Sequence, residues 1–141
     1  MTFKLTPLEA RDLWVKALRG GEYKQTSLGA LRDDTGHCCL GVGCDLYIKH
    51  EGEGSWEVRD EGEPYIFKVG GEASNSFLPE KVRLWLGLKS TDGSWAGAHE
   101  RGAAKPAEWG HNATLAGLND FHHTFASIAD RIEAGEVGFE P

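Results

Sequence analysis

The chain passes from strand to helix within His37-Cys38-Cys39-Leu40-Gly41-Val42-Gly43-Cys44-Asp45. Turn-forming residues at 33–36 lie just before this stretch and separate two short apolar runs, a pattern typical of a β-hairpin. From there onward the apolar side chains recur at helical spacing, at Leu40, Cys44, Tyr47 and Ile48. We therefore expect a hairpin with strands at 30–32 and 37–39, followed by a helix over about residues 39–49.

Helix signals are clear at both ends of the chain. Thr6-Pro7-Leu8-Glu9 provides an N-cap, a first-turn proline and a capping-box glutamate in order, and Gly20-Gly21 ends that helix. Near the other end, Thr124 is the predicted N-cap of a helix whose apolar face continues to Ile132. Two more helices are expected at 79–86 and 114–119.

Between these helices the pattern changes to that of strands. Residues 56–59 and 65–69 are predicted as two strands separated by a polar turn, and Gly70-Gly71 ends the second one. The sequence thus predicts an α+β fold with about five short helices around a small antiparallel sheet. We expect a single domain over residues 1–141, interrupted by an irregular loop at about 88–112.

Composition narrows the class of protein further. With 141 residues, 40% of them hydrophobic and 26% charged, the chain is typical of one globular domain. It has no run of about 18 apolar residues that would cross a membrane, and its start lacks the apolar stretch of a signal peptide. We therefore expect a protein of the cytosol in which it is made, with no membrane partner and with its three cysteines as thiols.

The negative charge is concentrated in the middle of the chain. Residues 51–80 hold eight carboxylates against two cations, so that this segment supplies −6 of the net charge of −7. A broad basic footprint for nucleic acid is absent, which argues against a nucleic-acid partner. The alternatives for this segment are an ordinary solvated face and a surface for a basic partner. The predicted partner surface consists of Glu57, Asp60, Glu61 and Glu63.

The irregular stretch 88–112 is the second candidate for binding. A stretch this long without periodicity is typical of a functional loop, although a mobile insertion is the alternative. Its indole rings suit stacking on a planar base, and its basic side chains suit phosphate. For a small nucleotide-like ligand, the predicted binding residues are Trp95, His99, Arg101, Lys105, Trp109 and His111.

The cysteine segment offers imidazole and thiolate, which are ligands that zinc prefers. Its spacing lacks the paired Cys-x-x-Cys of strong zinc motifs, and Cys38 and Cys39 on a strand would point to opposite faces. Cysteine is also among the most buried residue types. We therefore favour core packing and no cofactor, with zinc at His37, Cys38 and Cys44 as the alternative. No nucleophile elbow, P-loop or dinucleotide fingerprint is present.

The connector before the last helix is a further candidate. The pair His122-His123 could bind metal with Asp120, whereas neighbouring residues on a short connector more often face solvent or cap the next helix. The last two helices also have the order of a helix-turn-helix. However, Arg131 is the only cation on the exposed side of the second one, and a DNA reader needs phosphate contacts.

Several strings together resemble a family of small uncharacterised phage and prophage proteins. They are residues 14–25 (WVKALRGGEYKQ), Leu31-Arg32, residues 38–42 (CCLGV) with Cys44-Asp45, residues 78–80 with 85–88, and parts of 115–130. The resemblance covers most of the chain outside the acidic middle and the 88–112 loop. Gly43 departs from it, since a bulkier residue is expected there. The resemblance implies a small accessory protein that acts on host machinery by binding.

The leading hypothesis is a non-catalytic phage accessory protein that binds a host component, for instance as an inhibitor of host defence. The component is either a protein that meets the acidic surface or a nucleotide-like signal held by the 88–112 loop. A metal-dependent enzyme is the second hypothesis, using His37 and the cysteines or the histidines between 111 and 123. A helix-turn-helix transcriptional regulator is the third.

Overall fold

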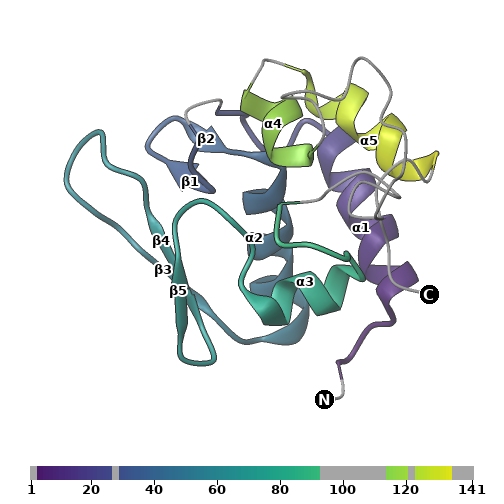
Figure 1. Cartoon of the computed structure of the whole chain (residues 1–141), viewed down its shortest axis with the longest axis horizontal. Coiled ribbons are helices and arrows are strands. Elements are labelled where there is room, and N and C mark those ends of the chain that lie inside the picture. The colour runs from purple at the N-terminus through teal and green to yellow at the C-terminus, as the bar shows by residue number, and fades with distance from the viewer. Residues whose placement is uncertain (1–2, 27–28, 93–113, 121–122, 135–141) are drawn as a thin grey trace, which may run out of the picture.

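The computed structural model describes residues 3–26, 29–92, 114–120 and 123–134, which form five helices and two small antiparallel sheets (Figure 1). The chain therefore has the predicted α+β class. The helices are α1 (Pro7–Arg19), α2 (Cys39–Glu51), α3 (Glu80–Leu86), α4 (Leu115–Asp120) and α5 (Phe125–Glu133). The strands are β1 (Arg32–Asp33), β2 (Gly36–His37), β3 (Ser55–Glu57), β4 (Ile66–Val69) and β5 (Glu72–Ser74). None of the described helices is long and apolar enough to cross a membrane.

Helix α2 lies at the centre, with α1, α3 and α4 packed around it (Figure 1). It is buried over most of its length because apolar and small residues occupy every side of it from Cys39 to Tyr47. At Gly41 the helix touches the backbone of Leu31, whose carbonyl a methyl group at position 41 would overlap. Glycine is therefore needed for this close approach between α2 and the segment before the hairpin.

Helix α1 begins where the sequence predicts. The Thr6 hydroxyl accepts a hydrogen bond from Glu9 N at 3.2 Å, and the Glu9 carboxylate accepts one from Thr6 N at 2.9 Å, so both halves of the capping box form. Further along, the fully buried Trp14 donates its indole N–H to the Cys39 carbonyl at 2.9 Å. This bond satisfies the polar atom of a large core side chain and joins α1 to the start of α2.

The hairpin before α2 is present, but its predicted second strand is wrong. Strand β2 ends at His37, whereas the sequence predicts a strand over 37–39. Cys38 is instead the N-cap of α2, and its Sγ accepts a hydrogen bond from Gly41 N at 3.4 Å. Since the chain turns into the helix here, Cys38 and Cys39 are both buried and do not face opposite sides of a strand.

The larger sheet has the order β3-β4-β5 and contains a strand that the sequence analysis lacks. Gly70 and Gly71, with φ of 54° and 87°, turn the chain so that β4 continues into the short antiparallel strand β5. The two sheets are also connected, since Tyr65 N donates to Arg32 O at 2.8 Å. This bond places the β1–β2 hairpin beside the loop that joins β3 to β4.

Helices α4 and α5 are fixed by polar contacts as well as by their apolar faces. Thr124 caps α5 as predicted, accepting from Ser127 N at 3.1 Å. On the outer side of the α1–α5 contact, Arg19 binds both Asp130 (2.6 Å) and Glu133 (2.9 Å). These carboxylates raise the pKa of Arg19, so the cation is permanent.

Asn119 of α4 is a fully buried polar residue that joins three segments. Its Oδ1 accepts from Gln25 Nε2 at 2.9 Å and from Cys39 N at 3.1 Å, and its Nδ2 donates to Thr26 O at 2.6 Å. Gln25 in turn accepts from Phe125 N at 3.1 Å. The amides of Asn119 and Gln25 thus anchor α4 and α5 on the start of α2.

Candidate partner-binding surface

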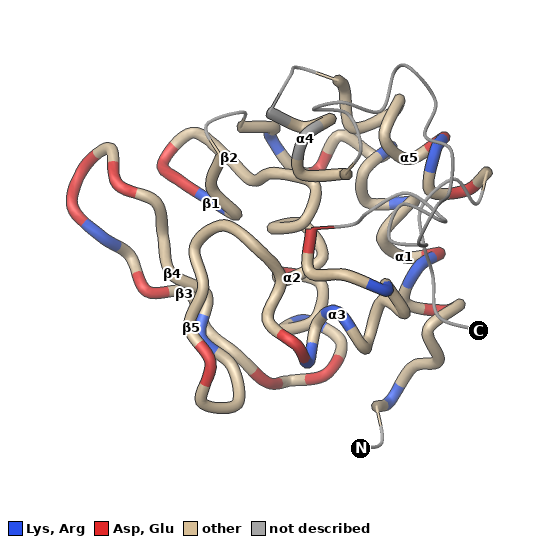
Figure 2. The backbone as a smooth tube through the Cα atoms, viewed as in Figure 1, with Lys and Arg blue, Asp and Glu red and all other residues tan. Residues whose placement is uncertain are grey.

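The loop between β3 and β4, residues 58–64, is named here the acidic loop. It projects from the sheet beside the β1–β2 turn, and Figure 2 shows acidic residues on most of its outer edge. All of its residues are exposed, including Val58 with 66% of its surface accessible. Together with Asp34 and Glu57 it forms the acidic surface, whose members are Asp34, Glu57, Asp60, Glu61 and Glu63. Four of these five residues are the partner surface that the sequence predicts.

Two cations, Arg59 and Lys68, neutralise only the part of the acidic surface that Glu57 and Glu63 form. Arg59 lies 3.4 Å from Glu57 and 3.6 Å from Glu63, and Lys68 Nζ lies 2.9 Å from Glu57. The hydrogen bond from Lys68 holds the pKa of Glu57 below its ordinary value. Asp60 and Glu61, by contrast, form no ion pair with any cation of the described segments and carry their charge at the tip of the loop.

The acidic loop is held in place by the neighbouring hairpin. Asp34 accepts a hydrogen bond from Tyr65 Oη at 2.9 Å and one from Gly62 N at 3.3 Å. The Arg32 guanidinium lies over the ring of Trp56 at 5.4 Å and over that of Tyr65 at 4.9 Å, within the range of cation–π attraction. The loop therefore presents its carboxylates from a braced position.

Sequence reasoning missed the residues that brace the loop. Asp34 and Arg32 lie in the hairpin, far from the acidic loop in sequence, and only the fold brings them together. The sequence offers one signal, which is that two aspartates stand in the β1–β2 turn. Asp33 alone is enough to cap this turn, so Asp34 is left for another role. The Asp33 Oδ1 accepts from Thr35 N at 2.8 Å and from Gly36 N at 3.2 Å.

Beneath the surface lies a small polar cluster around Asp45 of α2. Asp45 accepts from Tyr23 Oη at 2.7 Å and from Trp56 Nε1 at 3.2 Å, and it pairs with Lys49 at 3.4 Å. Burial alone would raise the pKa of Asp45, but these hydrogen bonds and the Lys49 charge outweigh it and lower the pKa. The Trp56 ring thus contacts the Arg32 guanidinium, and its indole N–H donates to Asp45 of α2. These two contacts fix the base of the acidic surface.

His37 fills the space between these rings. Its imidazole stands edge to face with Tyr23 at 5.0 Å and with Trp56 at 5.9 Å. Burial, followed by the charge of Arg32, lowers the pKa of His37 to about 4. Its Nε2 is buried without a hydrogen-bond partner in the described part of the chain. His37 is therefore a neutral aromatic spacer at neutral pH.

The structure does not assemble the alternative metal site. The described segments contain no group of three His, Cys, Asp or Glu side chains that could hold a metal ion, so His37, Cys38 and Cys44 do not form one. Cys44 is fully buried in α2, and burial raises the pKa of its thiol. Cys39 Sγ lies 3.5 Å from the Leu115 carbonyl. The three cysteines are buried in the core, which is the interpretation that the sequence favours.

The predicted small-ligand site lies outside the described residues. This applies to its six members, Trp95, His99, Arg101, Lys105, Trp109 and His111, and also to His122 of the connector. The beginning of the predicted irregular loop is described: Leu78 N donates to Thr91 O at 3.0 Å, and Ala116 N donates to Asp92 O at 3.2 Å. The nucleotide-like ligand therefore stays a prediction.

The last helix does not favour the regulator hypothesis. Helix α5 packs its apolar face on α1, and its acidic residues Asp130 and Glu133 are paired with Arg19. Helix α5 thus carries carboxylates, whereas a helix that reads DNA needs cations for the phosphates.

The fold and this surface define a class, an α+β protein with a braced, exposed acidic loop. Residues 8–136 match the model of a family described as Domain of unknown function (DUF8296), and the chain belongs to this family. No curated protein and no solved structure matches the chain.

Proposed function

We propose that this protein is a non-catalytic phage accessory protein that binds a host protein through its acidic surface. The bound region of the host protein carries lysine and arginine, and the binding inhibits a component of host defence. The resemblance described above supports the phage origin, and the acidic surface supports a partner of positive charge.

The observation that supports this proposal is the position of Asp60 and Glu61. They form no ion pair within the described residues, and their two charges are part of the net charge of −7. Such a concentration of like charge raises self-repulsion, and it speeds association with an oppositely charged surface. A loop braced on a rigid scaffold is also where binding residues are commonly placed.

The experiment compares two charge reversals in affinity capture from host lysate. The variant D60K/E61K removes the charge at the tip of the loop. The matched control D12K/E22K reverses two exposed acids elsewhere and raises the net charge from −7 by the same four units. We expect the wild type and the control to retain the same basic protein, with retention falling as salt is raised.

Loss of that protein with D60K/E61K alone supports the proposal. Equal retention by wild type and by both variants overturns it, because the acidic tip would then have no part in the interaction.

A further inference from the structure

The β3–β4–β5 sheet has one covered face and one open face. Side chains alternate along its strands, and the inner row contains Trp56 and the fully buried Phe67. The outer row crosses all three strands, because Ser55 is opposite Lys68 and Lys68 is opposite Ala73. These three residues are exposed, and among the described elements the helices lie on the other side of the sheet (Figure 1).

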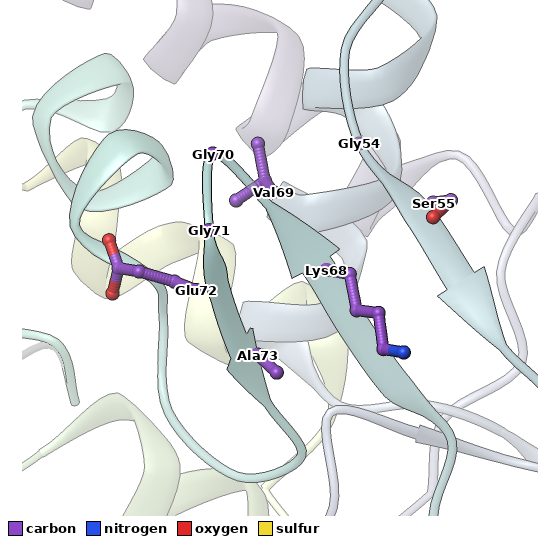
Figure 3. A pocket seen from close by; sticks show the side chains of 8 residues that line it. All are labelled: Gly54, Ser55, Lys68, Val69, Gly70, Gly71, Glu72 and Ala73. Carbon is purple, nitrogen blue, oxygen red and sulfur yellow. The ribbon is translucent and has the colours of Figure 1, made fainter.

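Two adjoining hollows lie on this open face. The first has a volume of about 530 Å³ and is lined by the outer row together with the glycines that flank it (Figure 3). The second has a volume of about 440 Å³, and its apolar lining is provided by Ile66, Ala73 and Phe77. Phe77 is 50% exposed, although phenylalanine side chains are usually buried in the core. Since Ala73 lines both hollows, they form one continuous surface.

The charge around this surface indicates what would cover it. Glu57 lies on the outer face two residues after Ser55, and the acidic loop follows directly. The Glu57 carboxylate is paired with Lys68 at 2.9 Å and with Arg59 of the acidic loop at 3.4 Å. A second copy of the chain also carries a net charge of −7 and is disfavoured by like-charge repulsion. The first hollow is also lined by the charged Glu72, whereas the hollow beside Ile66 and Phe77 is mainly apolar. An apolar hollow next to carboxylates fits a chain that is apolar in part and basic in part.

We propose that the open face of the β3–β4–β5 sheet receives an extended segment of the partner protein in which apolar residues alternate with lysine or arginine. The inference rests on the proposed function and specifies how the partner is held. The apolar side chains of the segment occupy the hollow beside Ile66 and Phe77. Its cations reach Glu57 and the acidic loop, where they compete with Lys68.

The test uses a capped synthetic peptide of alternating lysine and valine as the probe, and a glutamate–valine peptide as its control. Binding to ¹⁵N-labelled full-length protein is followed by amide chemical shifts. We expect the lysine probe to shift the amides of Ser55, Lys68 and Ala73 as well as those of the acidic loop. The glutamate peptide should leave all of them unchanged.

Two variants separate the sheet face from the loop. Ala73→Tyr fills the shared wall of the hollows with a strand-favouring residue, and we expect the dissociation constant of the lysine probe to rise about fivefold or more. The control Ala126→Tyr alters an exposed alanine of α5 and should change nothing. Lys68→Gln removes the competing cation, and the affinity should rise about threefold, a gain that a purely structural role would not give.

The outcomes distinguish this inference from the proposed function. Shifts confined to the acidic loop, with Ala73→Tyr binding as well as the wild type, overturn the sheet-face inference and leave the proposed function standing. Loss of binding in D60K/E61K has the same meaning if the probe leaves Ser55 and Ala73 unshifted in the wild type. Absence of any shift with the lysine probe at low salt also overturns the inference, while the lysate capture decides the proposed function separately.

Discussion

The Tyr65 hydroxyl donates a hydrogen bond to Asp34 Oδ1 at 2.9 Å across 31 positions of the sequence. The other carboxylate oxygen of Asp34 accepts from Gly62 N at 3.3 Å, so one side chain holds both the acidic loop and the residue between that loop and β4. The position of the loop therefore depends on a residue of the β1–β2 turn. This relationship makes the brace testable without disturbing the core, because all three residues lie at the surface.

Asp34→Ala should release the acidic loop. The hydrogen bond to Asp34 is the main cause of the raised pKa of Tyr65, so the pKa of Tyr65 should fall towards its ordinary value in the variant. The Gly62 amide should also exchange faster with solvent, since it loses its acceptor. Ultraviolet titration of tyrosine and amide hydrogen exchange measure the two effects. Asp60→Ala is the control, and an unchanged Tyr65 titration in Asp34→Ala would show that the brace is absent.

His37 should make stability depend on pH. Its folded-state pKa is about 4 and the ordinary value is 6.5, so between these values the unfolded chain binds a proton that the folded chain does not. Stability contributed by neutral His37 is therefore complete above the upper value and is lost as pH falls through this window. The loss should be about 1–2 kcal/mol, allowing for solvent screening at a partly exposed ring.

The measurement is urea unfolding of wild type and His37→Phe over the same pH window. The phenyl ring keeps the contacts with Tyr23 and Trp56 and cannot titrate, so the variant should lose this part of the pH dependence. His50→Gln changes an exposed histidine of α2 and should follow the wild type. Identical slopes for wild type and His37→Phe would contradict the prediction.

Helix signals in the sequence were reliable because they are local. The capping box Thr6-Glu9 and the N-cap Thr124 depend on residues three positions away, and both form as predicted. The helix α2 begins at Cys39 as predicted, but the second hairpin strand was predicted two residues too long. Cys38 was assigned to that strand because a cysteine seldom caps a helix, its sulfur being a weak acceptor. Strand β5 was missed because its three residues, Glu72 to Ser74, are too few to show the alternating pattern of a strand.

The surface was predictable in composition but not in architecture. Counting charges is enough to single out Glu57, Asp60, Glu61 and Glu63. The bracing by Arg32 and Asp34 depends on strand register and on which loops meet, and no local pattern encodes either one. The open sheet face was unpredictable for the same reason, since the row Ser55–Lys68–Ala73 requires the strand that the sequence did not show.

Asn119→Ala should destabilise the fold strongly although it removes only a small side chain. Asn119 is fully buried, and its replacement removes the buried hydrogen bonds that its side chain makes with Cys39 N and Thr26 O. Unsatisfied buried groups cost about 1–3 kcal/mol each, so the free energy of unfolding should fall by about 2–4 kcal/mol. Urea unfolding measures this loss. The exposed Asn75→Ala is the control, and a loss in Asn119→Ala no larger than in this control would refute the anchoring role.

The two glycines of α2 should respond differently to alanine. In an exposed helix this change is favourable by about 1 kcal/mol, so any loss reports packing. At Gly41 the added methyl group overlaps the Leu31 carbonyl, and backbone cannot move aside without disturbing the hairpin. At Gly43 it meets Leu86 Cδ1 at 2.9 Å, the end of a side chain that can rotate.

Gly41→Ala should therefore lower the free energy of unfolding by about 3 kcal/mol, and Gly43→Ala by about 1 kcal/mol or less. Thermal and urea unfolding of the two variants measure the difference under one condition. Equal losses would mean that Leu31 is not held against α2, and the position of the hairpin that braces the acidic loop would then need another cause. A larger loss at position 41 ties the central helix to the hairpin that braces the acidic loop.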